Sequence, residues 1–182
     1  VLVIGLGDIG TTFARKMKVL GAHVTGIRRS QKPKPEYVDA QYTMEALPEL
    51  LPQAVIVAMS LPGYSDTKGV IGEKELQLMK SNAILLNVGR GTAIDSLALA
   101  KALQGRSIYG AGLDVTDPEP LPEDHPLWDA PHCIITPHVS GGYALPETLE
   151  KILNLSIENL ERYEKGEALH NIIDFSTGYV KR

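Results

Sequence analysis

The segment Val1-Leu2-Val3-Ile4-Gly5-Leu6-Gly7-Asp8-Ile9-Gly10 decides the fold. Four aliphatic residues form a strand-like run, and a Gly-x-Gly-x-x-Gly turn leads from it into an amphipathic stretch at 9–20. Glycines in this place allow a tight turn and let backbone N–H groups approach a pyrophosphate at the start of a helix. The alternative is a turn that serves packing only, but the position between strand and helix favours a dinucleotide site.

The rest of the chain alternates between two kinds of pattern. Apolar runs rich in Val and Ile predict strands, and stretches with apolar residues three and four apart predict helices between them. The runs are continuous, which is typical of strands buried on both faces of a parallel sheet. We therefore expect an α/β Rossmann fold with a doubly wound parallel sheet over residues 1–144. The expected strands are 1–4, 23–27, 53–59, 83–88, 108–113 and 133–136, and the expected helices are 9–20, 44–51, 73–79 and 96–103.

The last part of the chain, 145–182, has a different pattern. A long helix is predicted over 146–165, with Pro146 in its first turn and Gly166 just past its end. A short returning strand is predicted over 171–175. The apolar face of this helix needs a cover, so we expect self-association as a homodimer.

Composition excludes several classes of protein. The formal net charge is −4, which argues against a nucleic-acid partner. No apolar run approaches the roughly 18 residues that a membrane span requires. The single cysteine excludes an internal disulfide framework and an all-cysteine metal site, and no metal ligands are predicted. We expect a cytoplasmic globular protein.

The end of the second expected strand bears on the choice of cofactor. An acidic residue here would accept hydrogen bonds from the 2′-hydroxyl of NAD, but the sequence has Arg28-Arg29-Ser30. Two guanidinium groups and a hydroxyl suit a 2′-phosphate, so NADP is favoured over NAD. A solvated arginine pair at a strand end is the alternative.

Charged side chains also follow the later strands. Arg90 lies between two glycines in Asn87-Val88-Gly89-Arg90-Gly91, and could hold a carboxylate or be solvated. Asp114, Glu119 and His138 follow the next two strands. A histidine paired with a carboxylate is a good proton donor near neutral pH. The other histidines have no such context and are interpreted as surface or capping residues: His23, His125, His132 and His170.

Together these segments resemble the D-isomer-specific 2-hydroxyacid dehydrogenases, a family that includes phosphoglycerate, formate, D-lactate and glyoxylate/hydroxypyruvate enzymes. The resemblance covers essentially the whole chain. It is most specific at 87–91, at 112–115 with Glu119-Pro120-Leu121-Pro122, and at Thr136-Pro137-His138.

The resemblance implies hydride transfer between NAD(P) and a small 2-keto or 2-hydroxy acid, glyoxylate/hydroxypyruvate-like or 3-phosphoglycerate-like. It implies that Arg90 orients the substrate, that His138 is the acid/base, and that Glu119 pairs with His138. The cofactor residues it implies, together with those argued above, are Gly5, Gly7, Asp8, Ile9, Gly10, Arg28, Arg29, Ser30, Ser60, Leu61, Pro62, Thr67, Val88, Gly89, Arg90, Asp114, His138, Ser140 and Gly141.

One departure from the family concerns the substrate domain. Family members enter the nucleotide fold after an N-terminal substrate-domain segment, whereas this chain starts inside the first Rossmann strand. We therefore expect that segment to be absent, with residues 145–182 returning to an incomplete substrate domain, and we expect poor turnover by this chain alone. A corepressor-like module that binds the dinucleotide without turnover is the alternative function.

Overall fold

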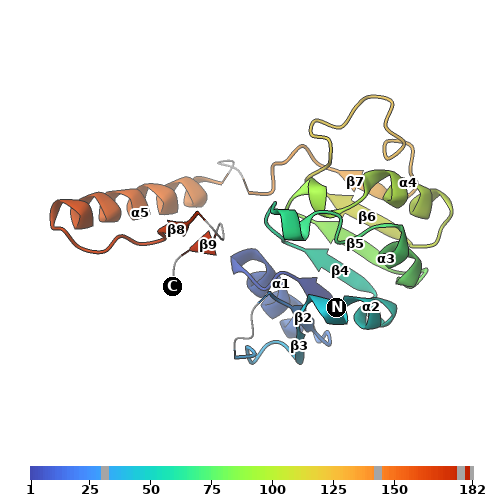
Figure 1. Ribbon diagram of the computed structural model, residues 1–182, viewed down its shortest axis with the longest axis horizontal. Helices are drawn as coiled ribbons and strands as arrows, with labels where there is room; N and C mark the ends of the chain where they lie inside the picture. The colour runs from blue at the N-terminus through green and yellow to red at the C-terminus, as the bar shows by residue number, and fades with distance from the viewer. Residues whose placement is uncertain (30–32, 142–144, 176–178, 181–182) are drawn as a thin grey trace. The chain divides into compact units, whose positions relative to one another are not determined.

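The computed structural model describes residues 1–29, 33–141, 145–175 and 179–180. Seven strands form one sheet in the order β3-β2-β1-β4-β5-β6-β7, and their described pairings are parallel (Figure 1). The chain order reverses between β1 and β4, which creates a switch point where ligands bind in such sheets. The strands are β1 Leu2–Ile4, β2 Thr25–Ile27, β3 Ala40–Tyr42, β4 Ile56–Met59, β5 Ile84–Asn87, β6 Gly110–Leu113 and β7 Cys133–Ile135.

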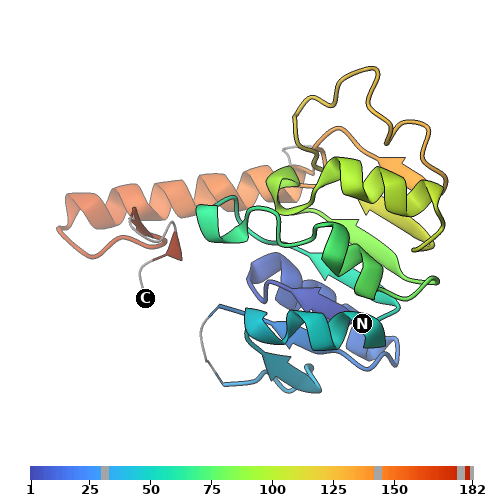
Figure 2. The ribbon, with the colours of Figure 1, turned by 45° about the vertical axis from the view of Figure 1, so that its right-hand side comes forward.

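Helices cover both faces of this sheet, as Figures 1 and 2 show. On one face α1 packs through Phe13, Ala14 and Met17 onto Val3 and its neighbours. The larger core on the other face holds apolar residues of α2, α3 and α4. These helices are α1 Asp8–Val19, α2 Leu47–Leu50, α3 Glu73–Leu78 and α4 Ser96–Gln104. The predicted Rossmann architecture is therefore confirmed.

The expectation that every strand is buried on both faces is wrong for β7. Val3 of β1 and Ile134 of β7 lie in the same row of partners across the sheet, which runs through Ala58, Leu86 and Gly112. Ile134 therefore lies on the same face as Val3, the face on which α1 packs. Ile134 is nevertheless 70% exposed. The reason is that β7 is the edge strand, whereas α1 packs at the opposite half of the sheet.

Two further differences concern short elements. Strand β3 was not predicted, because Ala40-Gln41-Tyr42 has no run of apolar residues. The helix expected over 44–51 is divided into a 3₁₀ turn at Met44–Ala46, α2, and a second 3₁₀ turn at Leu51–Gln53. Pro52 has no N–H to donate, so the α-helical ladder cannot continue through it.

The chain forms two compact units, Val1–His138 and Val139–Arg182. The second contains α5, Pro146–Glu164, followed by an antiparallel pair of β8, Ile173–Asp174, and β9, Tyr179–Val180. β9 was not predicted. The predicted domain limit at 144 falls within 142–144, outside the described residues. Among the helices described, none is long and apolar enough to cross a membrane.

Candidate active site

The glycine turn after β1 has the geometry that a dinucleotide needs. Gly5 has a φ of +98° and donates its N–H to the carbonyl of Ile27 over 2.9 Å. A Cβ at Gly10 would lie 1.9 Å from the Gly5 carbonyl oxygen, so the helix approaches the turn too closely for a side chain. A Cβ at Gly7 would meet nothing within 4 Å, so open space faces this residue.

The beginning of α1 faces the same turn. Gly7 is its N-cap, and no side chain caps the first N–H groups. Free N–H groups and the positive end of the helix dipole attract a phosphate. Asp8 and Ile9 form the first turn, and the Ile9 side chain is 55% exposed. The turn therefore fits a dinucleotide pyrophosphate.

The loops after β1, β4 and β5 are in contact. The Ser60 hydroxyl donates to the Gly5 carbonyl over 2.9 Å. A Cβ at Gly89 would lie 2.5 Å from the Leu61 carbonyl oxygen, so this loop also requires a glycine. The three predicted cofactor segments thus meet at the switch point of the sheet.

Thr67 shapes the loop that follows β4. It is buried, and its hydroxyl accepts from the Tyr64 N–H over 3.0 Å and lies within donating distance of the Pro62 carbonyl. Leu61 is buried as well, whereas Pro62 is half-buried. Thr67 therefore holds the loop in shape, and its contact with a cofactor stays a prediction.

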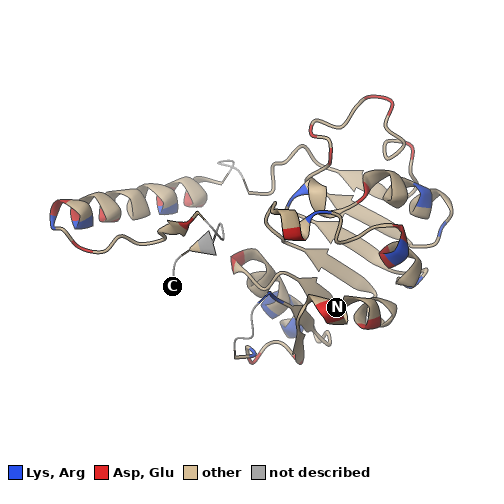
Figure 3. Ribbon diagram, in the orientation of Figure 1, with Lys and Arg blue, Asp and Glu red and all other residues tan. Residues whose placement is uncertain are grey.

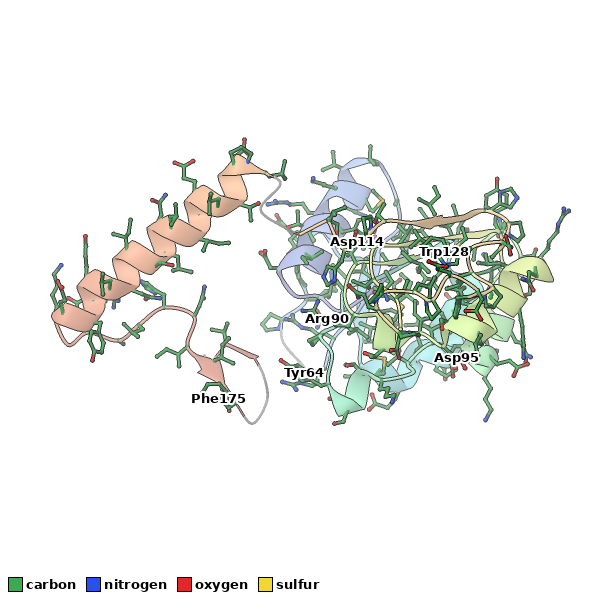
Figure 4. The ribbon with its side chains drawn as sticks, turned by 90° about the horizontal axis from the view of Figure 1, so that it is seen from above. Tyr64, Arg90, Asp95, Asp114, Trp128 and Phe175 are labelled. Atoms are coloured by element: carbon green, nitrogen blue, oxygen red, sulfur yellow. The ribbon has the colours of Figure 1, made fainter. Side chains whose placement is uncertain are left out.

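Asn87 sets the direction of the loop that carries Arg90. Asn87 is fully buried; its Oδ1 accepts from the Gly89 N–H and its Nδ2 donates to the Arg90 carbonyl, each over 3.0 Å. The Arg90 side chain is exposed and lies across Gly63, where a Cβ would be 3.1 Å from Arg90 Cγ. In the view of Figure 4, Arg90 and Tyr64 lie toward one side of the first unit, and Asp95 and Trp128 lie toward the other. Val88 is 38% exposed in the same loop.

The ends of β6 and β7 are joined through Asp114. The buried Asp114 carboxylate accepts from the Thr136 hydroxyl over 2.6 Å. Its carbonyl accepts the His138 N–H over 2.9 Å. His138 has a φ of +54°. These bonds hold the backbone of His138 at the carboxyl edge of the sheet.

The His138 imidazole pairs with the Glu119 carboxylate. Nδ1 lies 2.6 Å from Oε1, and the two side chains are 46% and 41% exposed. Glu119 lies in the acidic loop between β6 and β7, which Figure 3 shows in red and tan. Because Nδ1 faces Glu119, Nε2 is the ring nitrogen that remains for another partner. The predicted pair is formed in the structure, whereas its catalytic role is a proposal.

The arginine pair lies at the end of β2. The Arg28 N–H donates to the Tyr42 carbonyl over 3.1 Å, so the pairing of β2 with β3 continues one residue past Ile27. Arg28 is half-buried and Arg29 is exposed. Ser30 lies outside the described residues. Ser140 and Gly141 belong to the second unit, so their contribution to the cofactor site remains a prediction.

The cysteine offers no second reactive centre. Burial raises the pKa of the Cys133 thiol to about 11, so the thiolate is scarce at neutral pH. Among the described residues, no group of three or more His, Cys, Asp or Glu could hold a metal ion.

Sequence reasoning missed the supporting residues of this site, and its interpretation of His125 as a surface or capping residue missed the burial of this side chain. Asn87 and Thr136 were quoted within motifs, but their hydrogen bonds could not be read from spacing. His125 is not a surface residue: it is only 9% exposed and is bonded to Ser96 and to the Leu127 backbone. A histidine in a proline-rich loop becomes buried only through contacts with a distant helix, which local sequence does not show.

Comparison with known proteins finds a matching family and several similar relatives. Residues 1–140 match the family described as D-isomer specific 2-hydroxyacid dehydrogenase, NAD binding domain. A glyoxylate reductase of Aeropyrum pernix is 36% identical over 94% of this chain and 50% of its own length. The chain spans about half the length of the curated relatives it matches.

Two solved structures have the same fold. A D-isomer specific 2-hydroxyacid dehydrogenase from Xanthobacter autotrophicus Py2, in complex with NADPH and MES, has a TM-score of 0.88 and 36% identity, over 98% of this chain and 72% of that one. An NADPH-dependent glyoxylate/hydroxypyruvate reductase from Sinorhizobium meliloti, in complex with NADP and sulfate, has a TM-score of 0.87 and 27% identity, over 98% and 56%.

Proposed function

Because the chain belongs to the D-isomer-specific 2-hydroxyacid dehydrogenases, we propose that it serves NAD(P)-dependent reduction of a small 2-keto acid to the 2-hydroxy acid. The observation that carries this proposal is the His138–Glu119 pair, 2.6 Å apart and at the same sheet edge as Arg90 and the glycine turn. The glycine turn and the N-terminus of α1 would hold the pyrophosphate. A nicotinamide bound beside these residues supplies the hydride.

Arg90 would hold the substrate. Its guanidinium can donate two parallel hydrogen bonds to a carboxylate, a geometry that a lysine cannot offer. The buried amide of Asn87 and the close packing of Gly63 fix the start of this side chain. The keto oxygen would then lie within reach of a proton donor at the neighbouring strand ends.

His138 would donate the proton to the keto oxygen from Nε2. The Glu119 carboxylate at Nδ1 keeps the ring oriented, with Nε2 left for the substrate. Asp114, held by the Thr136 hydroxyl, would lie near the nicotinamide. The alternative of a regulatory module without turnover is not favoured, since the relatives described above are reductases by name.

We propose glyoxylate or hydroxypyruvate as the substrate type, because relatives bear these names. The test is NADPH oxidation with either acid, followed at the nicotinamide absorbance on the protein as it is encoded. His138→Ala should lower kcat by about 10²–10⁴-fold while leaving NADPH affinity nearly unchanged. His23→Ala, at an exposed histidine remote from the sheet edge, is the control. Turnover that survives His138→Ala would contradict the proposal.

We also propose a homodimer. The apolar side chains along α5 are 43–61% exposed within the described chain at Leu149, Ile152, Leu153, Ile157 and Leu160. An apolar stripe of this length requires cover. Light scattering coupled to gel filtration measures the assembly directly, and a monomer at all concentrations would reject the proposal.

A further inference from the structure

The segment between β6 and β7 is attached to the first turn of α4 by two side chains, Ser96 and His125. The Ser96 hydroxyl donates to the Asp117 carbonyl over 2.9 Å and lies 3.2 Å from His125 Nε2. The N–H of Leu127 donates to His125 Nδ1 over 3.2 Å. His125 itself is 9% exposed.

These bonds are consistent with one arrangement of protons. A backbone N–H can only donate, so Nδ1 of His125 carries no proton and the neutral ring has its proton on Nε2. Nε2 therefore donates to the Ser96 hydroxyl, which uses its own proton for the Asp117 carbonyl. In this arrangement each donor of the network is matched with an acceptor.

Apolar packing holds the later part of the segment, because Leu127, two residues after His125, is fully buried in the larger core. Around Asp117 the segment and α4 instead line an open pocket of about 440 Å³, whose walls include Ser96, Asp117, Pro118 and His125. The backbone just before Asp117 lies against Gly91, where a Cβ would be 1.9 Å from the Thr116 carbonyl oxygen, and the bond from Ser96 holds the chain as it leaves this contact.

Asp117 lies two residues before Glu119 in Asp117-Pro118-Glu119-Pro120. The ring of Pro118 fixes φ at the one residue between Asp117 and Glu119, and Pro120 restricts the backbone of Glu119, so the chain has few ways to rearrange here. The Thr116 hydroxyl also donates to the Pro118 carbonyl over 3.0 Å. A displacement of Asp117 is therefore passed on to the Glu119 side chain.

We propose that Ser96 and His125 are positioning residues, which fix Asp117 and thereby hold Glu119 in contact with His138. The contact of Glu119 with His138 is exposed on both sides, so its own energy does not lock the loop. The importance of this positioning for catalysis rests on the proposed function, whereas the effect of Ser96 and His125 on the position of Glu119 does not.

The test follows the His138–Glu119 contact by NMR, through the ¹⁵N chemical shift of His138 Nδ1 at a fixed pH. Glu119→Gln should change this chemical shift, because the carboxylate that lies 2.6 Å from Nδ1 is removed. Ser96→Ala should change it in the same direction, by up to the same amount. The double variant should change it no further than Glu119→Gln alone, because both substitutions remove the same contact.

Two variants serve as controls. Ser96→Thr keeps the hydroxyl and should restore the wild-type chemical shift of His138 Nδ1. Ser107→Ala removes a hydroxyl that donates to the Ala102 carbonyl near the other end of α4, so it costs a comparable hydrogen bond outside the network. An Nδ1 chemical shift that Ser96→Ala and Ser107→Ala leave equally unchanged would overturn the proposal.

A measurement on the unaltered protein decides the case if Ser96→Ala does not fold. The ¹⁵N shifts of the His125 ring should show a neutral imidazole with its proton on Nε2, and a proton on Nδ1 would overturn the proposal. If Ser96→Ala changes the His138 resonance but the protein reduces no keto acid, only the proposed function is rejected. If the protein reduces a keto acid but Ser96→Ala leaves the His138 resonance unchanged, only the positioning role is rejected.

Discussion

Arg90 shows how the fold places a single side chain of the proposed site. It follows a strand whose last residue, Asn87, is fully buried and uses both ends of its amide to bend the chain. The neighbouring glycines are required by close contacts: Gly89 against Leu61, and Gly91 against Thr116. The position of Arg90 is thus a consequence of the Asn87 amide and of two glycines whose surroundings leave no room for a side chain.

Alanine substitutions at Gly7 and Gly10 should affect cofactor binding and stability differently. Gly7→Ala should leave the free energy of unfolding within about 0.5 kcal/mol, because its Cβ would meet no protein atom within 4 Å. It should still weaken cofactor binding, since that space is where the pyrophosphate would lie. Gly10→Ala should do both, with a loss of about 1–3 kcal/mol from the clash with the Gly5 carbonyl.

Urea denaturation and NADPH titration of the two variants measure these effects. Equal destabilisation by Gly7→Ala and Gly10→Ala would show that the turn is tight throughout. Unchanged NADPH affinity in Gly7→Ala would remove the turn from the cofactor site.

Residue positions were predictable where they depend on strand ends. The carboxyl ends of parallel strands share one edge, so the sequence could indicate that Arg90 and His138 lie at the same edge. It could not indicate the burial of His125, because that depends on the approach of α4 from another part of the chain. The close packing of Gly63 on Arg90 was missed for the same reason.

At the scale of elements, the Asp39 carboxylate joins α1 to the chain that leads into β2. Asp39 accepts from Lys18 Nζ over 2.6 Å and from the Val24 N–H over 2.8 Å. The hydrogen bond from Lys18, and then that from Val24, lowers the pKa of Asp39 to about 2. Asp39 thus connects the last turn of α1 to the start of the second strand.

This depressed pKa predicts a pH-dependent contribution to stability. The folded-state pKa is about 2 and the ordinary value is 3.8, so the contribution is full above about pH 4 and is lost as the pH falls toward 2. Asp39→Asn should lower Tm at pH 7, and the difference from wild type should shrink as the pH falls below 4. Glu36→Gln, at an exposed acid nearby, is the control. A Tm difference that is constant from pH 7 to pH 3 would contradict this assignment.

The first turn of α4 depends on a conventional N-cap. Asp95 Oδ1 accepts from the Ala98 N–H over 3.0 Å. Asp95→Ala should cost about 1 kcal/mol of the free energy of unfolding, and Asp95→Asn should recover most of it. Urea denaturation measures both, and an equal loss in the two variants would show that charge rather than capping matters.

Elements with strong patterns were predicted well, and weak ones were not. Six strands of the sheet follow from runs of apolar residues, and the helix at Pro146–Glu164 follows from apolar residues three and four apart. β3 and β9 are two or three residues long and form only because a neighbouring strand offers its edge. Pairing of that kind is a tertiary effect, so no local pattern announces it.

At the scale of the whole molecule, the sheet order brings the chemistry together. The reversal between β1 and β4 places the glycine turn at the centre of the carboxyl edge, with the arginine pair after β2 on one side. Arg90, Asp114 and His138 follow β5, β6 and β7 on the other side. A dinucleotide lying across this edge would have its ribose phosphate near Arg28 and its nicotinamide near His138.

Titration of the protein with NADPH and NADH by fluorescence tests this placement of the dinucleotide. NADPH should bind about tenfold more tightly at low salt, since a charge-assisted hydrogen bond to the 2′-phosphate contributes at least about 1.5 kcal/mol. Added salt should reduce the preference, because the arginine pair lies at the surface. Arg28→Asp should weaken NADPH binding, whereas Lys101→Asp, at an exposed cation on α4, should not. Equal affinities for the two cofactors at low salt would contradict the role of the arginine pair, and the absence of saturable binding by either would contradict the site itself.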